Sequence, residues 1–198
     1  MNCKLQCTCG TVQGTLDLTG GVNRVICYCR DCQAFAHYLG REESYLNEHG
    51  GSDIVQTSPY RLTFTAGMEQ LRSVRLKPDG MLRWYTGCCK TPVGNTLANY
   101  KWSFIGLTRP IFAAEEGAGF DALIGQVGKH VNTDSAKGEL NATPSHPIRG
   151  FINILAKMLL LRLNRRYRNT PFFDVAGKPL AEPHVLDVGE QTKLYERV

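Results

Sequence analysis

Seven of the eight cysteines lie in three short groups along the chain. The first group is Cys7 and Cys9, the second is Cys27, Cys29 and Cys32, and the third is Cys88 and Cys89. Side chains two residues apart on a strand point to the same face, so each group can direct its thiolates at one ion. Thiolate clusters of this kind select zinc and, less often, iron–sulfur clusters. The sequence therefore predicts a zinc-binding protein.

The number of cysteines separates two kinds of site. Cys7, Cys9, Cys88 and Cys89 supply four thiolates, which is enough for a closed structural zinc site. Cys27, Cys29 and Cys32 supply three, which leaves the fourth position open, as in catalytic zinc sites. Adjacent cysteines rarely both bind one ion, so Cys3 is the reserve ligand for the first site. A purely structural role for all of the cysteines is the alternative interpretation, and disulfides are a weaker one.

Charge and the chain start exclude several classes of protein. The first residues show no apolar run after a basic start, which predicts no signal peptide and a reducing, cytoplasmic location. Residues 149–168 carry six basic residues and no acid, whereas the rest of the chain has 17 basic and 18 acidic residues. A nucleic-acid-binding surface over the whole fold is therefore not expected.

Residues 1 to about 109 have the pattern of short strands with glycine and proline turns. Apolar alternation or apolar runs mark residues 11–18, 22–29, 61–65, 71–77, 81–85 and 102–107. This pattern predicts a mainly β, antiparallel domain over residues 1–109, followed by a mixed helical extension over residues 110–198 that packs on it.

The extension contains one strong helix prediction, residues 147–168. Pro147 suits the first helical position, with Ser145 or His146 as the cap. The apolar part of this helix is about 16 residues long, shorter than the roughly 20 residues that span a membrane. Its broad apolar face favours packing on the β domain or in a homodimer, and lying on an anionic membrane is the alternative. The tail after Thr170 is predicted to be irregular.

Three ordered motifs resemble those of a known zinc-binding family. They read Cys7-Thr8-Cys9-Gly10-Thr11-Val12, Cys27-Tyr28-Cys29-Arg30-Asp31-Cys32 and Cys88-Cys89-Lys90-Thr91-Pro92. Over residues 3–108 the chain resembles the glutathione-dependent formaldehyde-activating enzyme and centromere protein V family. Thr86 stands where that family has a further cysteine, and Lys90 stands where it has a glycine. Either Cys88 or Cys3 would then complete the first site.

The resemblance implies a zinc-bound β-tent fold, a structural zinc at the first and third motifs, and a thiol-accepting zinc at the second. The family's reaction joins formaldehyde to glutathione and is generalised as carbon–sulfur lyase activity. The hypothesis is an enzyme whose catalytic residues are Cys27, Cys29 and Cys32 and whose substrate is a small thiol adduct. The alternative is a non-catalytic zinc module that binds a partner through its extension. Arg30 is expected to be a solvated loop residue. His37 is expected to be a loop residue packed among aromatic side chains.

Overall fold

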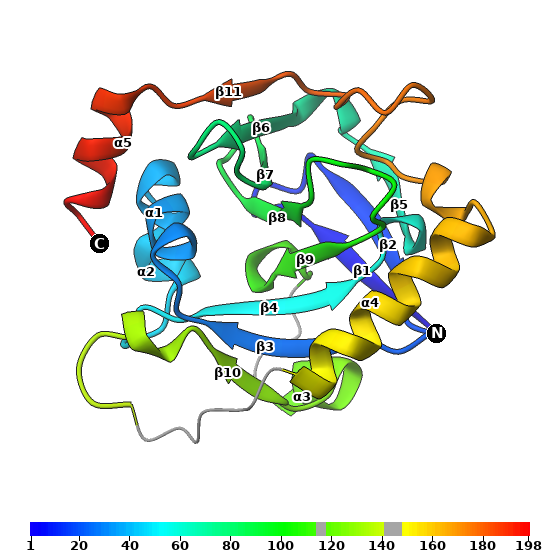
Figure 1. Ribbon diagram of the computed structural model, residues 1–198, viewed down its shortest axis with the longest axis horizontal. Helices are drawn as coiled ribbons and strands as arrows, with labels where there is room; N and C mark the ends of the chain where they lie inside the picture. The colour runs from blue at the N-terminus through cyan, green and yellow to red at the C-terminus, as the bar shows by residue number, and fades with distance from the viewer. Residues whose placement is uncertain (114–117, 141–147) are drawn as a thin grey trace.

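The computed structural model describes residues 1–113, 118–140 and 148–198. Two sheets form the fold (Figure 1). The smaller sheet joins β1 (Asn2–Gln6), β2 (Gln13–Asp17) and β5 (Leu62–Ala66) in that order, with both pairs antiparallel. Short apolar alternation explains these strands, because every second side chain turns inward.

The larger sheet has eight strands among the described residues. Their order is β10 (Lys129–Val131), β3 (Asn23–Cys27), β4 (Ser52–Thr57), β9 (Ile105–Thr108), β8 (Pro92–Thr96), β7 (Leu82–Thr86), β6 (Leu71–Arg75) and β11 (Pro183–Val185). The six inner strands pair antiparallel, and the outermost strands β10 and β11 pair parallel. The mainly β prediction is confirmed, and the two parallel pairs come from the extension.

The main core lies between the two sheets. Leu5 and Leu16 of the smaller sheet and Trp84 and Leu107 of the larger one belong to the same buried cluster. Strand β7 is buried along its whole length, because Trp84 faces this core while the next residue, Tyr85, faces a second core. A strand buried on both faces needs a layer on each side.

Helices supply that second layer. α1 (Arg30–Leu39), α2 (Glu42–Tyr45) and α5 (Val188–Tyr195) contribute to the second core, and α1 contacts α5 (Figure 1). In α1 the buried residues include Cys32, Phe35, Ala36 and Leu39, the spacing of one helix face, and Gly40 ends the helix at a φ of 62°. The sequence analysis predicted no helix within residues 1–109, and α1 and α2 are therefore additions to the mainly β prediction.

The extension contains more regular structure than the sequence predicted. α3 spans Ala118–Ile124 and α4 spans Ile148–Leu163. Short 3-10 turns occur in both parts of the chain. They are η1 (Pro59–Arg61), η2 (Met68–Gln70), η3 (Arg109–Ile111), η4 (Thr133–Ser135) and η5 (Arg166–Arg168). The irregular-tail prediction is wrong: β11 and α5 lie there, and Asp187 and Glu190 form a capping box that starts α5.

Helix α4 agrees with the prediction over most of its length and ends earlier. Arg165 adopts a φ of 59°, so the chain leaves the helix before η5. Pro147, Ser145 and His146 lie outside the described residues. Met158 and Leu161 are buried, but four leucines are exposed: Leu155, Leu159, Leu160 and Leu163. Among the described residues, no helix is long and apolar enough to cross a membrane.

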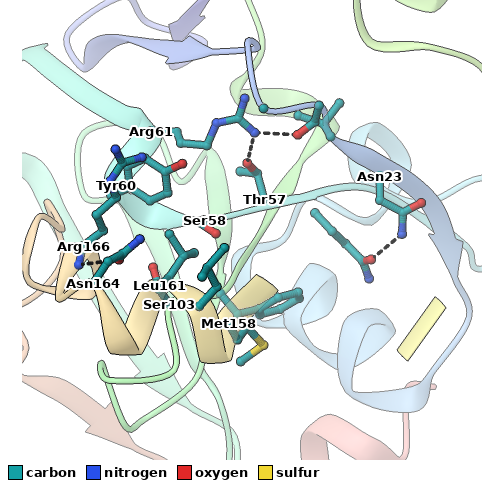
Figure 2. Close-up of a pocket in the computed structure, with 16 residues that line it drawn as sticks. Asn23, Thr57, Ser58, Tyr60, Arg61, Ser103, Met158, Leu161, Asn164 and Arg166 are labelled. Carbon is teal, nitrogen blue, oxygen red and sulfur yellow. Dashed lines mark hydrogen bonds between the residues drawn. The ribbon is translucent and has the colours of Figure 1, made fainter. Parts of the chain in front are cut away.

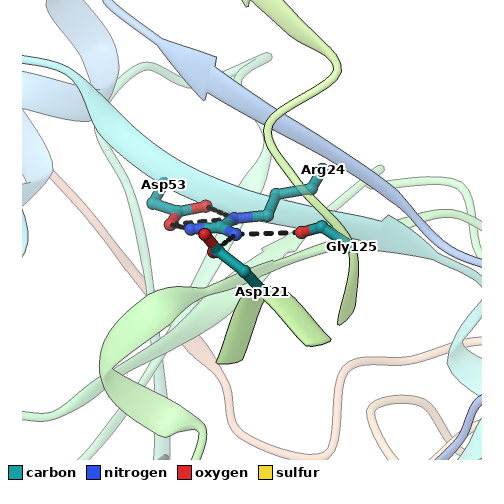
Figure 3. Close-up of polar contacts among 4 residues, drawn as sticks. All are labelled: Arg24, Asp53, Asp121 and Gly125. Carbon is teal, nitrogen blue, oxygen red and sulfur yellow. Dashed lines mark hydrogen bonds and ion pairs between the residues drawn. The ribbon is translucent and has the colours of Figure 1, made fainter. Parts of the chain in front are cut away.

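An ion-pair network ties the extension to the larger sheet (Figure 3). Arg24 of β3 donates from Nε and Nη2 to both carboxylate oxygens of Asp53 on β4, and from Nη1 to Asp121 of α3 and the Gly125 carbonyl. Its guanidinium also lies 4.6 Å from the ring centroid of Phe120. Hydrogen bonding to Asp53 is the main reason that the pKa of Arg24 is raised.

We expect Arg24→Met to lower the free energy of unfolding by about 2 kcal/mol, because it leaves the Asp53 carboxylate without its charged donor. Asp121→Asn, the matched control, should cost only about 0.5 kcal/mol, since the Asp121 side chain is 46% exposed and solvent screens its charge. Urea titrations followed by circular dichroism measure both. Equal costs for the two variants would contradict the assignment.

Candidate metal centres

The first and third cysteine groups meet at one point. The four sulfurs of Cys7, Cys9, Cys88 and Cys89 all lie within 4.8 Å of one another. Four of the Sγ–Sγ distances are 3.6 Å (Cys7 to Cys9), 3.9 Å (Cys7 to Cys88), 3.4 Å (Cys9 to Cys88) and 3.8 Å (Cys88 to Cys89). Zinc–sulfur bonds of about 2.3 Å place tetrahedral sulfurs about 3.8 Å apart. The arrangement therefore fits a tetrahedral metal ion.

Two tight turns position these sulfurs. Cys7 and Cys9 lie in the turn between β1 and β2, where the Gly10 amide donates to the Cys7 carbonyl and Gly10 adopts a φ of 80°. Cys88 and Cys89 lie in the turn between β7 and β8, where Lys90 adopts a φ of 59°. That left-handed conformation is one that glycine adopts more readily than lysine.

The two turns belong to different sheets, so the four-sulfur group joins the smaller sheet to the larger one. A direct contact supports the junction: the Thr91 hydroxyl accepts from the Thr8 amide at 3.0 Å and lies 2.9 Å from the Thr8 hydroxyl. Cys7 and Cys88 are 81 residues apart in sequence. A metal bound here would close a long loop.

Hydrogen bonds from the chain stabilise negative charge on the sulfurs of Cys7 and Cys89. The Val12 amide donates to Cys7 Sγ at 3.2 Å, and the Thr86 and Thr91 hydroxyls lie 3.3 and 3.1 Å from Cys89 Sγ. Burial raises the pKa of Cys89, but hydrogen bonds from threonine hydroxyls outweigh it and lower the pKa to about 4. Burial and a hydrogen bond to Cys9 raise the pKa of Cys88 to about 12. Metal binding would therefore release the Cys88 proton at neutral pH.

Both adjacent cysteines, Cys88 and Cys89, belong to the group, and Cys3 does not. Cys3 lies on β1 opposite Leu16, within the core between the sheets. The reserve role that the sequence suggested for Cys3 is therefore not needed to complete four ligands. The seven clustered cysteines are thiols, with no disulfide between them.

The second group lies at the start of α1. Cys27 is the last residue of β3, Cys29 caps α1 with extended backbone, and Cys32 lies in the first helical turn, where its amide donates to the Cys29 carbonyl at 3.0 Å. The three sulfurs lie within 4.8 Å of one another. No fourth cysteine, histidine or carboxylate joins them in the part of the chain that the structure describes. Cys27 and Cys32 are buried, and Cys29 is partly exposed.

One buried cation faces the second group. Arg83 of β7 is 4% exposed, and its Nη1 lies 3.9 Å from Cys32 Sγ and donates to Asn95 Oδ1 at 3.2 Å. Burial opposes its charge, but attraction to Cys32 and neighbouring groups outweighs burial and raises the pKa of Arg83. Arg83 also lies 3.7 Å from Asp31, whose charge is offset by Lys77 at 3.0 Å. Three thiolates, a metal dication and the Arg83 guanidinium would then sum to zero charge, which suits a buried site.

Further polar groups surround the three sulfurs. Asn132, after β10, donates from Nδ2 to Cys27 Sγ at 3.3 Å. The hydroxyl groups of Tyr45 and Ser52 are buried near these sulfurs. Ser52 pairs with Cys27 in the sheet. Burial, and after it the charge of Cys32, raises the pKa of Tyr45, whereas the interaction of Tyr45 with Ser52 lowers it.

The thiols of the second group share their protons unequally. Hydrogen bonds from Cys29 and then Cys32 lower the pKa of Cys27 to about 2. The pKa of Cys32 is raised, first by its hydrogen bond to Cys27 and also by burial. A metal ion would displace the protons that remain on Cys29 and Cys32.

The C-terminal helix borders this group, which the sequence did not predict. Tyr195 of α5 donates its hydroxyl to Asp31 Oδ1 at 2.6 Å, and Arg30 donates to the Tyr195 carbonyl at 3.1 Å. Arg30 is exposed, as expected. The loop expected at His37 is wrong, because His37 lies in the last turn of α1, with its Nδ1 3.2 Å from Glu42 Oε1. The capping box Asp187-x-x-Glu190 was the sequence signal for α5.

Replacing a cysteine of the first group should remove its metal. We expect Cys9→Ser and Cys88→Ser each to lose one metal ion per chain, measured by elemental analysis. We also expect both to lose about 4 kcal/mol of stability, as for a cross-link that closes a loop of roughly 80 residues. Cys3→Ser is the matched control and should keep the wild-type metal content. Metal loss in Cys3→Ser but not in Cys88→Ser would show that Cys3 is the fourth ligand.

Comparison with known proteins gives a family and little else. A search of curated proteins finds no match. A crystal structure of a Rhodobacter sphaeroides protein, a Northeast Structural Genomics target, is similar at 17% identity and a TM-score of 0.42 over 63% of this chain and 96% of that one. That score is too low to support an argument about the fold. The sequence profile described as "Family of unknown function (DUF6151)" matches residues 2–184. Because the match covers most of the chain, the protein belongs to the DUF6151 family.

Proposed function

We propose that the protein is a zinc-dependent enzyme of carbon–sulfur chemistry, which forms or cleaves the adduct between a thiol, such as glutathione, and a small aldehyde. In this proposal Cys7, Cys9, Cys88 and Cys89 hold a structural zinc ion, and Cys27, Cys29 and Cys32 hold a second one. Free thiols in these clusters favour a reducing, cytoplasmic setting.

One observation carries the proposal: the second group has three cysteine ligands and no fourth protein ligand among the described residues. Three protein ligands with one open position are typical of catalytic zinc, whereas structural sites have four. Zinc at such a position lowers the pKa of a bound thiol, so that the thiol is held as a thiolate near neutral pH.

The exposure of the three cysteines indicates how a substrate would approach. Cys27 and Cys32 are buried and Cys29 is partly exposed, so access is from the side of Cys29. Arg30 and Tyr195 lie at this side, because Arg30 follows Cys29 in the chain and donates to the Tyr195 carbonyl at 3.1 Å. The exposed guanidinium of Arg30 is placed to attract a carboxylate of an incoming thiol.

The proposed reaction balances without any further reactant. The thiol sulfur forms a bond to the carbonyl carbon of the aldehyde, and the thiol proton is transferred to the carbonyl oxygen, which gives an S-hydroxyalkyl product. The reverse reaction breaks the carbon–sulfur bond. Arg83, buried and positive beside Cys32, keeps the site near neutrality while the incoming thiolate adds its charge.

Zinc content is the first test. Wild-type protein should contain two zinc ions per chain, and Cys29→Ser should contain one while keeping its circular dichroism spectrum. In cobalt-substituted protein, glutathione should change the sulfur-to-cobalt absorption of wild type and of Cys3→Ser, but not of Cys29→Ser. Wild type should then speed the exchange between formaldehyde and its glutathione adduct, seen by NMR.

A single zinc ion that Cys29→Ser leaves in place would contradict the proposal. So would a cobalt spectrum that glutathione does not alter, because the open position would then be closed to thiols.

The second candidate function is a non-catalytic zinc module that binds a partner through its extension. The observation that favours it is the exposure of four leucines on α4: Leu155, Leu159, Leu160 and Leu163. The two candidates differ at the second cysteine group, which a non-catalytic module does not need to leave open to thiols.

A further inference from the structure

A surface cavity of about 270 Å³ lies between the larger sheet and α4, away from the cysteines (Figure 2). Its wall is formed by the turn before β3, the end of β4 with η1, residues 103–104, and α4 with η5. No cysteine is among the residues that line it. The cavity is therefore separate from both candidate metal centres.

Two polar side chains in its wall are buried and incompletely paired. Arg61 is 7% exposed and Ser103 is 3% exposed. Arg61 Nη1 donates to the Gly21 carbonyl and to Thr57 Oγ1, but its Nη2 has no acceptor within the described residues, and neither has Ser103 Oγ a partner there. Both atoms have almost no accessible surface in this structure, so the wall would have to shift slightly before a ligand could pair with them.

The charge of the cavity wall is positive only. Arg61 and Arg166 line it, and none of the lining residues is acidic. In the described part of the chain, no ion pair joins Arg61 to a carboxylate. Asp17 has a lowered pKa mainly because Thr19 donates hydrogen bonds to it, with Arg61 a lesser cause. The wall therefore attracts an anion.

The side chains of α4 make the opposite wall apolar. Met158 and Leu161 are buried side chains of α4 that line the cavity, and Val22 and Phe104 add further apolar surface. Figure 2 shows Ser58 between Arg61 on one side and the side chains of α4 on the other. The volume equals that of roughly nine water molecules, which corresponds to a ligand of about ten non-hydrogen atoms.

We propose that this cavity binds a small carboxylate with an apolar body of about ten non-hydrogen atoms. The exposed guanidinium of Arg166 pairs with the carboxylate, the buried charge of Arg61 attracts it, and the apolar body packs against Met158 and Leu161. Two guanidinium groups in a wall without acidic residues suit the single charge of a carboxylate better than a phosphate dianion, which needs more donors. This inference does not depend on the proposed enzyme function.

Calorimetric titration of the full-length protein tests the proposal with three probes of equal length: octanoate, octanamide and octylamine. Octanoate should bind at least about tenfold more tightly than neutral octanamide, the scale of one charged hydrogen bond. The cation octylamine should show no binding. Cys29→Ser should bind octanoate as wild type does, which separates this result from the fate of the metal proposal.

A matched pair of variants locates the site. Arg166→Gln should weaken octanoate binding by about tenfold, whereas Arg168→Gln, which removes the same charge from η5 outside the cavity wall, should change it by less than about twofold. Arg61→Gln should abolish binding, with the fold checked by circular dichroism. Equal binding of octanoate and octanamide, equal effects of the two η5 variants, or no octanoate binding at millimolar concentration would each overturn the proposal.

Discussion

The convergence of four sulfurs from two sheets is the constraint on which the rest of the structure depends. The sulfurs lie 3.4–3.9 Å apart at the measured pairs, too close for four thiolates to coexist without a cation. A bound dication would relieve this repulsion and would hold the β1–β2 turn against the β7–β8 turn. The same two turns follow the strands β1 and β7, whose Leu5 and Trp84 belong to the core between the sheets.

The negative charge of the thiolates in the second cysteine group is compensated in a different way. It is more buried than the first and has one thiolate fewer, and a single guanidinium, that of Arg83 on β7, lies beside Cys32. The first group has no such cation in contact with its sulfurs among the described hydrogen bonds, and its Cys9 and Cys88 are exposed to water, which screens the charge. The buried three-cysteine group with its compensating positive charge suits a site at which a ligand exchanges. The more exposed four-cysteine group suits a structural cross-link that stays in place.

The sequence predicted the cysteine groups and most strands, because these depend on local spacing. It predicted the pairing of the first group with the third from the number of thiolates that a closed zinc site needs. It missed α1, although the apolar spacing of Cys32, Phe35 and Leu39 and the terminal Gly40 signalled a helix. It missed α5, whose capping box was visible. The partners of β10 and β11, the approach of Arg83 to Cys32, and the cavity wall could not be predicted, because each brings together segments far apart in the chain.

The two parallel strands that the extension supplies have a structural consequence for shortened forms of the protein. β10 covers β3 and β11 covers β6, so the two edge strands of the larger sheet are three-residue segments from after position 110. A fragment ending near residue 109 would leave β3 and β6 with rows of open backbone donors and acceptors, which recruit strands from other molecules. Besides containing α4 and α5, the extension therefore covers the backbone groups of β3 and β6 that would otherwise favour aggregation.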